Sequence, residues 1–409
     1  MMKCRHCSAS LKVPFVDLAS APPSNAYLTA DALKRVEAWY PLRVLVCTEC
    51  WLVQTEDYAD RSMLFDSEYA YFSSFSSSWL THCKAHVGAM IARANLSAQS
   101  LVAEVAANDG YLLQYFCERD ITCYGIEPTA STAQAARAKG LEIVEEFFGV
   151  RLGQRLADDG RCVDVAIANN VLAHVPDIND FVGGFRYLLK PDGIATFEFP
   201  HLYRLIEDAQ FDTVYHEHFS YLSLTAVARI FAANGLTVFD VEELSTHGGS
   251  LRVYAQRSDT GRRPPSENIA SVLQLEERAG LKRADYYVEF QQRIYAIKRE
   301  LLEFLLAAQK RGELVAAYGA AAKGNTLLNY AGVRGDLIAY AVDRNPAKQG
   351  KYLPGSRIPI VAESELAARQ PQWILILPWN LREEVVEQLA YTRRWGARFL
   401  TAVPHLQEW

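Results

Sequence analysis

The chain has 409 residues, 22% of them charged, and a formal net charge of -6 at pH 7. This length favours two or three domains over one core, and the negative charge disfavours nucleic-acid binding, which usually needs a basic surface. No apolar window is long enough to span a membrane and no signal-peptide core stands near residue 1, so we expect a cytoplasmic protein that does not contact membranes.

Two C-x-x-C pairs stand in the first 75 residues, a segment rich in loops and prolines. Two such pairs supply the four thiolates of a closed tetrahedral Zn²⁺ site, which is structural because no ligand position remains for a substrate. We predict a structural zinc domain over residues 1–75, with free or redox-active thiols as the alternative. The expected ligands are Cys4, Cys7, Cys47 and Cys50, and the expected core cysteines are Cys83, Cys117, Cys123 and Cys162.

From about residue 80 to 255, strand-like and helix-like segments alternate, which predicts an α/β fold with a mostly parallel, helix-covered sheet. Strands are expected at 101–106, 123–128, 141–146, 163–169, 193–200 and 236–244, and a helix at 131–140.

The turn after the strand at 101–106 lies where α/β folds bind nucleotides. Of the glycine fingerprint of dinucleotide enzymes only Gly110 is present, and Ala106 and Ala107 stand where glycines would let a pyrophosphate approach, which disfavours NAD. Glu127 ends the next strand, where a carboxylate can accept both ribose hydroxyls. This combination favours S-adenosylmethionine, which has no phosphate. The expected cofactor residues are Glu104, Ala106, Asn108, Gly110, Tyr111, Leu112, Glu127, Pro128, Asn169 and Asn170.

Two further segments carry chemistry-bearing side chains. His174 follows the strand at 163–169, at the sheet edge where ligands bind. Residues 213–223 read TVYHEHFSYLS, and in an extended conformation His216 and His218 would share one face while Glu217 points away. These side chains suit either acid/base chemistry near neutral pH or imidazole ligation of a metal.

Pro264 and Pro265 mark a break before a helical region. One helix is predicted there, because apolar residues recur at spacings of three and four. Segments 314–320, 337–343 and 373–379 then restart a βαβ rhythm, which predicts a second, smaller α/β domain. The helical stripe consists of Tyr287, Phe290, Ile294, Ile297, Leu301 and Phe304.

The chain resembles the S-adenosylmethionine-dependent sugar-nucleotide C-methyltransferases, which make branched deoxysugars. The resemblance covers the whole chain in order. It implies a zinc domain (1–75), a Rossmann-like class I methyltransferase domain (76–258) and a C-terminal α/β domain (259–409). It also implies a nucleotide-linked 4-ketosugar, with dTDP as the nucleotide, bound between domains. The matching pieces are the C-x-x-C pairs, YAYFSSFSSSW (69–79), EVAANDGYLLQ (104–114), NNVLAHVPD (169–177), YHEHFSYLS (215–223), HGGSLRVY (247–254), YGAAAKGNTLLN (318–329) and VDRNPAKQGKYLPGSRIPI (342–360).

The resemblance also implies roles for individual residues. His218 is the expected base, with Tyr215 and Glu217 around the sugar and His174 lining the site. A tyrosine of the YFSS stretch, either Tyr69 or Tyr71, is implicated as well. The expected substrate-binding residues are His216, Tyr221, Gly319, Lys323 and Asn325.

These roles fit the chemistry of carbon methylation. Carbon accepts a methyl group only when it is nucleophilic, and a base acting together with an oxyanion donor can form an enolate next to a ketone. His218 would be the base, and His174, His216 or a tyrosine hydroxyl would hold the enolate oxygen. The alternatives are a nicotinamide-dependent oxidoreductase acting on the same sugars and a non-catalytic zinc-ribbon interaction protein.

Overall fold

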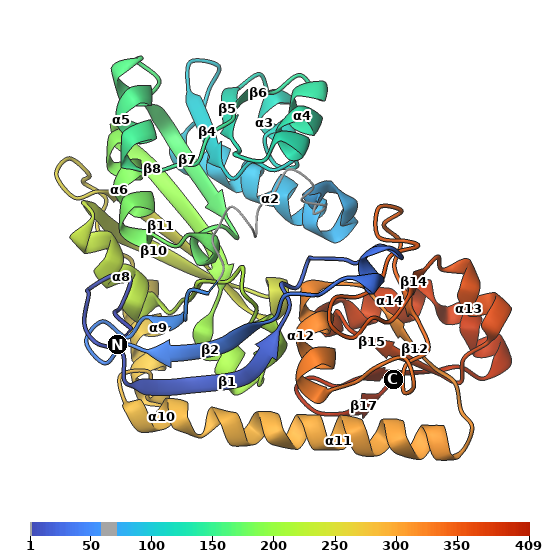
Figure 1. Ribbon diagram of the computed structural model, residues 1–409. Coiled ribbons are helices and arrows are strands. Elements are labelled where there is room, and N and C mark those ends of the chain that lie inside the picture. Colours follow the sequence, from blue (N-terminus) through green and yellow to red (C-terminus); the bar gives the residue numbers. More distant parts are fainter. Residues whose placement is uncertain (1, 59–71) are drawn as a thin grey trace.

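The computed structural model describes residues 2–58 and 72–409 (Figure 1). Its first sheet is antiparallel, in the order β1-β2-β3-β9. The fourth strand, β9, comes from the YHEHFSYLS segment, so the N-terminal sheet incorporates a piece of chain from far along the sequence. The strands are β1 (Val13–Ala21), β2 (Tyr40–Val46), β3 (Val53–Thr55) and β9 (Ser220–Tyr221), and a 3₁₀ turn, η1, spans Ala32–Lys34.

The second sheet has seven strands in the order β10-β11-β8-β7-β4-β5-β6, and all neighbours are parallel except for β11, which is antiparallel to both of its neighbours. Helices lie on both faces (Figure 1). The strands are β4 (Leu101–Val105), β5 (Thr122–Ile126), β6 (Glu142–Val144), β7 (Val163–Asn169), β8 (Leu189–Pro200), β10 (Leu236–Leu244) and β11 (Ser250–Arg257). The helices and 3₁₀ turns of this part are η2 (Ser73–Phe75), α2 (Ser77–Ala94), α3 (Gln114–Cys117), α4 (Ala130–Ala138), α5 (Val150–Asp158), η3 (Leu172–His174), α6 (Ile178–Leu188), α7 (Leu202–Glu207), η4 (Phe211–Thr213), α8 (Leu224–Ala233) and η5 (Thr246–Gly248).

The third sheet has the order β14-β13-β12-β15-β16-β17 and is parallel except for β17. Its strands are β12 (Val315–Tyr318), β13 (Ala341–Val342), β14 (Ile360–Val361), β15 (Trp373–Ile376), β16 (Arg398–Thr401) and β17 (Gln407–Glu408). The accompanying helices and 3₁₀ turns are α9 (Glu267–Ala279), α10 (Ala284–Val288), α11 (Phe290–Lys310), α12 (Ala322–Ala331), α13 (Ser364–Arg369), η6 (Trp379–Leu381), α14 (Arg382–Gln388) and η7 (Ala390–Trp395).

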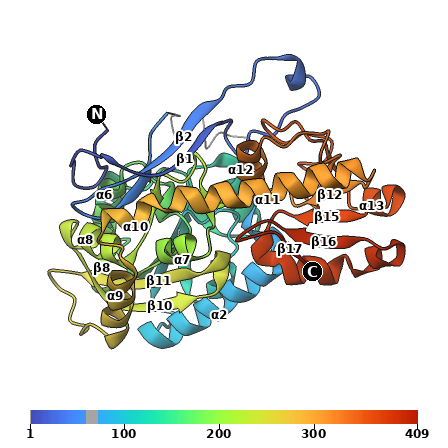
Figure 2. The ribbon, with the colours of Figure 1, turned by 90° about the horizontal axis from the view of Figure 1, so that it is seen from below.

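Helix α11 links the first and third sheets (Figure 2). The predicted apolar stripe is divided between two helices, with Tyr287 in α10 and the rest in α11, and it is buried in a cluster that contains residues of both β1 and β12. Phe290, for example, stacks on Phe15 of β1 with ring centroids 4.5 Å apart. Toward the end of α11 the buried face of the helix shifts by one residue, so that Leu305 is buried and Phe304 is only partly covered. Phe304 packs edge-on against Trp373.

Two further expectations from the sequence concern the cysteines outside the zinc site and membrane-spanning segments. Of the four expected core cysteines only Cys83 is buried: Cys123 and Cys162 are half-buried, and Cys117 is exposed at the end of the short helix α3, so the expectation is wrong for Cys117 and holds only in part for the other two. In the described part of the chain, no helix has both the length and the apolar composition needed to cross a membrane.

Candidate active site

A cavity of about 640 Å³ lies between the central and C-terminal sheets. The ends of β4, β5, β7 and β8 line one side, which is the carboxyl edge where parallel α/β sheets bind ligands. The start of α12 and the η6 turn line the other side, and Asn25 reaches in from the N-terminal segment. All three parts of the chain therefore contribute to one site.

Glu127 organises the cofactor side of the cavity. Its Oε2 accepts a hydrogen bond from the Asn108 backbone N–H and its Oε1 accepts one from that of Thr129, both at 2.9 Å. Burial raises the pKa of this carboxyl. The turn before it needs Gly110, whose φ is +76° and whose added Cβ would lie 2.1 Å from Leu141 Cδ1. The loop is thus fixed around a carboxylate that retains lone pairs for ligand hydroxyls.

The side chain of Asn169 indicates whether S-adenosylmethionine fits the cavity wall at the carboxyl ends of the central strands, which we call the cofactor rim. Asn169 lines the cavity at the end of β7, and within the described residues neither its side-chain oxygen nor its side-chain nitrogen has a protein partner, although both are buried. Buried polar atoms are normally hydrogen-bonded, so an amide left open at a cavity wall fits a polar ligand such as an adenosyl or amino-acid group.

Most of the predicted cofactor residues lie at the cavity wall, and the others lie behind it. Glu104 and Leu112 are fully buried, and burial raises the pKa of Glu104 well above its ordinary value. Gly110 acts through backbone shape. The lining members are Ala106, Asn108, Tyr111, Glu127, Pro128, Asn169 and Asn170.

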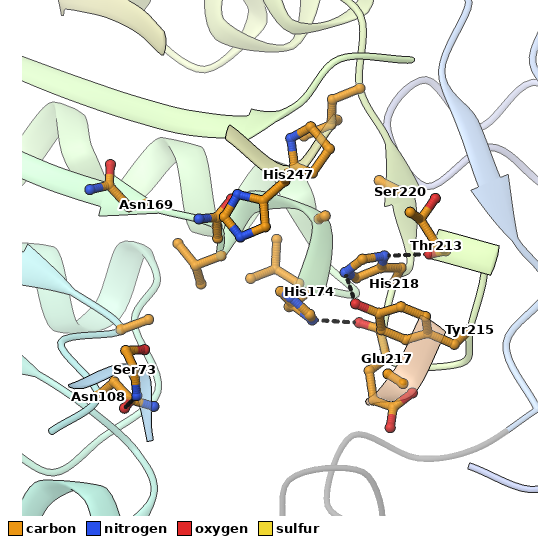
Figure 3. Close-up of a pocket in the computed structure, with 18 of the residues that line it drawn as sticks. Ser73, Asn108, Asn169, His174, Thr213, Tyr215, Glu217, His218, Ser220 and His247 are labelled. Atoms are coloured by element: carbon orange, nitrogen blue, oxygen red, sulfur yellow. Dashed lines mark hydrogen bonds between the residues drawn. The ribbon is translucent and has the colours of Figure 1, made fainter. Parts of the chain in front are cut away.

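His218 is held by hydrogen bonds to both ring nitrogens (Figure 3). Nδ1 lies 2.8 Å from the Thr213 carbonyl, which can only accept, so Nδ1 carries the proton. Nε2 therefore has the lone pair, and the Tyr215 hydroxyl donates to it at 2.8 Å. Burial lowers the pKa of His218 well below its ordinary value, so the ring is neutral. A neutral imidazole with its basic nitrogen at a cavity can accept a proton.

His174 shows the same arrangement. Its Nδ1 donates to the Glu217 carbonyl at 2.8 Å, and its ring centroid lies 4.6 Å from that of His218. Burial lowers the pKa of His174 to about 4. Both imidazoles are thus neutral and both direct Nε2 as an acceptor, which argues against the expectation that His174 donates a hydrogen bond to an enolate oxygen.

Residues 213–223 are not extended throughout, so the alternation of side chains that an extended conformation would give does not hold. His216 and Glu217 form a turn, closed by the His218 N–H donating to the Tyr215 carbonyl at 3.0 Å. The turn points Glu217 toward the cavity with His218 and removes His216, whose Nε2 lies 3.2 Å from the Pro41 carbonyl. The side chains separate because β3 and β9 pair directly after the turn and fix its direction.

The C-terminal side contributes a half-buried cation. Lys323 donates to Asn380 Oδ1 at 3.0 Å and lies 4.5 Å from the ring centroid of Trp379. The Trp379 indole N–H donates to Asp212 Oδ2 at 2.7 Å. Burial lowers the pKa of Lys323 and raises that of Asp212 to about 6. A carboxyl group of the central part, behind the cavity wall, thus lies within electrostatic range of an ammonium group of the C-terminal part that lines the cavity.

The other predicted substrate residues divide into two groups. Tyr221 lines the cavity, whereas Gly319 and Asn325 do not. Gly319 has a φ of +91° and an added Cβ would lie 2.5 Å from Pro378, so it shapes the loop that leads to α12. Asn325 donates to the Ser24 carbonyl at 2.7 Å and holds the N-terminal segment. Tyr69 and Tyr71 lie outside the described residues.

Sequence reasoning missed three cavity residues that the structure brings in. Lys348 donates to the Ala320 carbonyl at 2.7 Å, and His82 and His247 lie on the opposite wall. Lys348 and His247 each belong to a segment that carried the family resemblance, so that resemblance was the available signal. His82 stands in a helical stretch with no motif around it.

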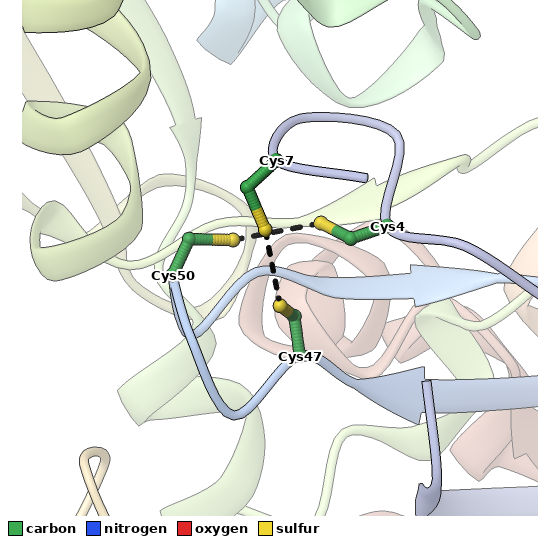
Figure 4. Close-up of side chains that lie close together, drawn as sticks. All are labelled: Cys4, Cys7, Cys47 and Cys50. Carbon is green, nitrogen blue, oxygen red and sulfur yellow. Dashed lines mark hydrogen bonds between the residues drawn. The ribbon is translucent and has the colours of Figure 1, made fainter. Parts of the chain in front are cut away.

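The four predicted zinc ligands lie together (Figure 4). Their sulfur atoms are all within 4.8 Å of one another, with 3.5 Å between Cys4 and Cys50 and between Cys7 and Cys47. Sulfurs around a tetrahedral Zn²⁺ lie about 3.8 Å apart, so the set fits this ion after small adjustments. Within residues 2–58 and 72–409 no other group of three or more histidine, cysteine or acidic side chains could hold a metal, which disfavours a metal at the histidine cluster.

Comparison with known proteins supplies the family. Three family models match: "Putative zinc binding domain" over residues 4–65, "Methyltransferase domain" over 90–241 and "C-methyltransferase C-terminal domain" over 245–404. The C-methyltransferase NovU of Streptomyces niveus is 32% identical over 404 residues, which is 98% of this chain and 95% of that relative. The chain belongs to this family of C-methyltransferases. The predicted enzyme class, S-adenosylmethionine cofactor and structural zinc are thereby confirmed.

Two solved structures resemble part of the chain. Magnesium protoporphyrin IX methyltransferase of Synechocystis PCC 6803 is 18% identical, with 44% of this chain and 79% of that one covered and a TM-score of 0.34. A S-adenosylmethionine-dependent methyltransferase of Clostridium acetobutylicum ATCC 824 is 9% identical, with 44% and 92% covered and a TM-score of 0.35.

In this C-methyltransferase the zinc domain contacts the loops that carry His174 and His218. Arg5, between the first two zinc ligands, donates to the Pro176 carbonyl at 2.9 Å and to the Thr55 carbonyl at 3.1 Å. Its guanidinium also lies 5.3 Å from the ring centroid of Phe219. Pro176 follows His174 closely in the sequence, and Phe219 directly follows His218. Arg5 of the zinc domain therefore contacts both of the loops that carry these histidines.

Proposed function

We propose that this enzyme transfers a methyl group from S-adenosylmethionine to the carbon adjacent to the ketone, C3, of a nucleotide-linked 4-ketosugar, with dTDP as the nucleotide. The observation that carries the proposal is the hydrogen-bonded series Thr213–His218–Tyr215 at the wall of the cofactor cavity. Transfer to oxygen or nitrogen needs no carbanion. Transfer to carbon requires a base that removes the α-proton, and the neutral Tyr215–His218 pair lies at the cavity wall next to the cofactor residues.

The base consists of Tyr215 and His218 acting together. The Tyr215 oxygen takes the α-proton of the substrate as its own proton passes to His218 Nε2, and the Thr213 carbonyl stabilises the imidazolium through Nδ1–H. The electron pair of the broken C–H bond moves into the enolate. S-adenosylmethionine, when bound, supplies an electrophilic methyl group. Glu127 and Asn169 on the cofactor side would hold that molecule, and the cavity would orient the substrate carbon toward it, which is the remaining contribution to rate.

The diphosphate of the substrate is placed at the C-terminal wall. Lys323 and Lys348 line the cavity there, and Lys323 stands in the first turn of α12 with two backbone N–H groups of that turn nearby at Ala321 and Ala322. A helix N-terminus and two ammonium groups favour an anion. The chain as a whole is acidic, so these local cations matter for binding a charged substrate.

The three-part organisation is proposed on the same basis: a zinc domain (1–75), a methyltransferase domain (76–258) and a C-terminal domain (259–409) that binds the nucleotide. The three sheets follow this order except for β9, which pairs with the N-terminal sheet. A cytoplasmic location fits a protein whose zinc site needs four reduced thiols.

Isotope exchange tests the proposal without methyl transfer. In deuterium oxide, with the nonreactive S-adenosylhomocysteine present, the wild-type enzyme should exchange the α-proton of a dTDP-4-ketosugar, as followed by mass spectrometry. His218→Asn should lower both this exchange and methylation by about 10²-fold or more, because Asn cannot accept the proton. His405→Asn, at an exposed position, is the matched control. Near wild-type exchange by His218→Asn would place the base elsewhere.

A further inference from the structure

The proposed base leaves one requirement of enolate formation unassigned. As the α-proton leaves, negative charge develops on the ketone oxygen, and a hydrogen-bond donor at that oxygen contributes about 10²–10³-fold to the rate. His174 and His218 both place their protons on Nδ1, against carbonyl groups, and present Nε2 as an acceptor. The two histidines of the predicted cluster therefore supply no donor to the cavity.

Several other donors near the cluster are already directed at protein acceptors; the buried hydroxyls of Ser220 and Tyr221, which have no partner among the described residues, are the exceptions. The Tyr215 hydroxyl donates to His218, and the Thr213 hydroxyl donates to the Gln210 carbonyl at 2.7 Å. The Asn25 amide donates to Glu217 Oε1 at 3.2 Å. Lys323 donates to Asn380 on the wall assigned to the diphosphate.

His247 has the properties that the missing donor needs. It lines the cavity, and in Figure 3 it lies between Asn169 of the cofactor rim and the His174–His218 pair. Its Nδ1 is buried and has no hydrogen-bond partner among the described residues. A neutral imidazole always carries one N–H, and a neutral imidazole can polarise a carbonyl group in an enolising enzyme.

The backbone at His247 has an uncommon conformation, and the neighbouring residues stabilise it. His247 has a φ of +56°, a left-handed conformation that is uncommon for residues other than glycine and that clusters at functional sites. Gly248 and Gly249 follow with φ of +89° and +111°, and an added Cβ at either would clash with Trp379 or Arg204. The Thr246 hydroxyl donates to the buried Glu198 at 3.0 Å, and the Trp79 ring packs edge-on against the imidazole.

We propose that His247 is a further catalytic residue that donates its imidazole N–H to the ketone oxygen of the substrate. This inference rests on the proposed enolate chemistry. The C–H bond breaks, its proton goes to the Tyr215–His218 pair, and its electron pair forms the C=C bond while the carbonyl π electrons move to the oxygen that His247 holds. Formation of the C–CH₃ bond then restores the ketone, the S–CH₃ electron pair stays on sulfur, and the proton leaves to solvent.

Two nearly isosteric variants test the donor role. Asn and Asp both tolerate left-handed backbone and fill the same space, but Asn has an amide N–H at the place of Nδ1 and ionised Asp has no donor. In the exchange assay with S-adenosylhomocysteine, His247→Asn should keep exchange within about tenfold of wild type. His247→Asp should lose about 10²–10³-fold or more. Calorimetric binding of S-adenosylhomocysteine should be equal for both variants.

The outcomes separate this inference from the function on which it rests. If the wild-type enzyme exchanges but the Asn and Asp variants are equally fast or equally slow, His247 is not the donor and the proposed function stands. If the wild type fails to exchange the α-proton of any nucleotide 4-ketosugar, the enolate proposal fails first. If His247→Asp loses exchange together with cofactor binding, His247 shapes the cofactor rim and the donor role is overturned.

Discussion

At the scale of single residues, burial decides which protonation state the cavity histidines adopt. His174, His218 and His247 all have pKa values lowered by burial, to about 4 for His174 and His247. The tautomers are then set by the carbonyl groups that accept from Nδ1 of His174 and His218. None of this can be predicted from sequence spacing, because Thr213 and Glu217 adopt these positions only through the turn at 216–217.

The lowered pKa values predict an unusual pH profile for proton exchange. A base works when it is neutral, and a histidine whose pKa is lowered in the folded state stays neutral as the pH falls below its ordinary value of about 6.5. We expect kcat/KM for exchange to stay level as the pH falls through the ordinary histidine value of about 6.5, and to decrease only well below it, because burial lowers the pKa of His218.

The measurement is a pH series of the exchange reaction, with circular dichroism at each pH to confirm that the protein remains folded. An acidic limb centred at or above the ordinary histidine pKa would show that the working base is solvated, and would contradict the assignment to the buried Tyr215–His218 pair.

At the scale of secondary-structure elements, the strands were the most predictable feature and the loops that hold the site the least. The segments expected as strands at 101–106, 163–169 and 236–244 are β4, β7 and β10, because buried strands carry continuous apolar runs. The turn in the YHEHFSY segment could not be predicted from the sequence, because its direction depends on β3, more than 150 residues earlier in the chain, through pairs such as Gln54 with Ser220.

The contact between the zinc domain and the histidine loops predicts an effect on catalysis from a residue that does not touch substrate. Arg5 is buried and donates at the same time to Pro176 and Thr55. Lysine offers a point charge and cannot reproduce this planar fork. Arg5→Lys should lower kcat by about 10–10²-fold, since small displacements of catalytic groups are costly, with little change in KM.

Zinc content and folding give the control for Arg5. Metal analysis should still find one zinc per chain in Arg5→Lys, and the thermal midpoint should stay close to wild type. Arg43→Lys, an exposed arginine on β2 paired with Glu56, should change neither rate nor stability. Loss of zinc from Arg5→Lys in proportion to activity would mean that Arg5 supports only the metal site and does not position the histidine loops.

At the scale of the whole molecule, the cavity joins parts that have separate tasks. The central sheet supplies the cofactor rim at Glu127 and Asn169, and the C-terminal part supplies Lys323 and Lys348. The hydrogen bond from Trp379 to Asp212 ties the two walls together. Family resemblance predicted a site between domains, but the sequence pattern could not show which of Gly319, Lys323 and Asn325 faces the cavity.

This division of tasks predicts that cofactor and substrate binding can be separated by mutation. Lys323→Met keeps the length and apolar stem of the side chain but removes the ammonium group. If that group binds the diphosphate, the loss of one charge-assisted hydrogen bond, about 1.5–3 kcal/mol, should raise KM for the nucleotide sugar by about 10–10²-fold. Inhibition by free dTDP should weaken by the same factor, because dTDP retains the diphosphate. Calorimetric affinity for S-adenosylmethionine should be unchanged, since Glu127 and Asn169 are untouched.

Lys310→Met, at an exposed position of α11, is the matched control. If Lys323→Met binds free dTDP as tightly as wild type, the diphosphate lies elsewhere, and Lys348 becomes the residue to replace.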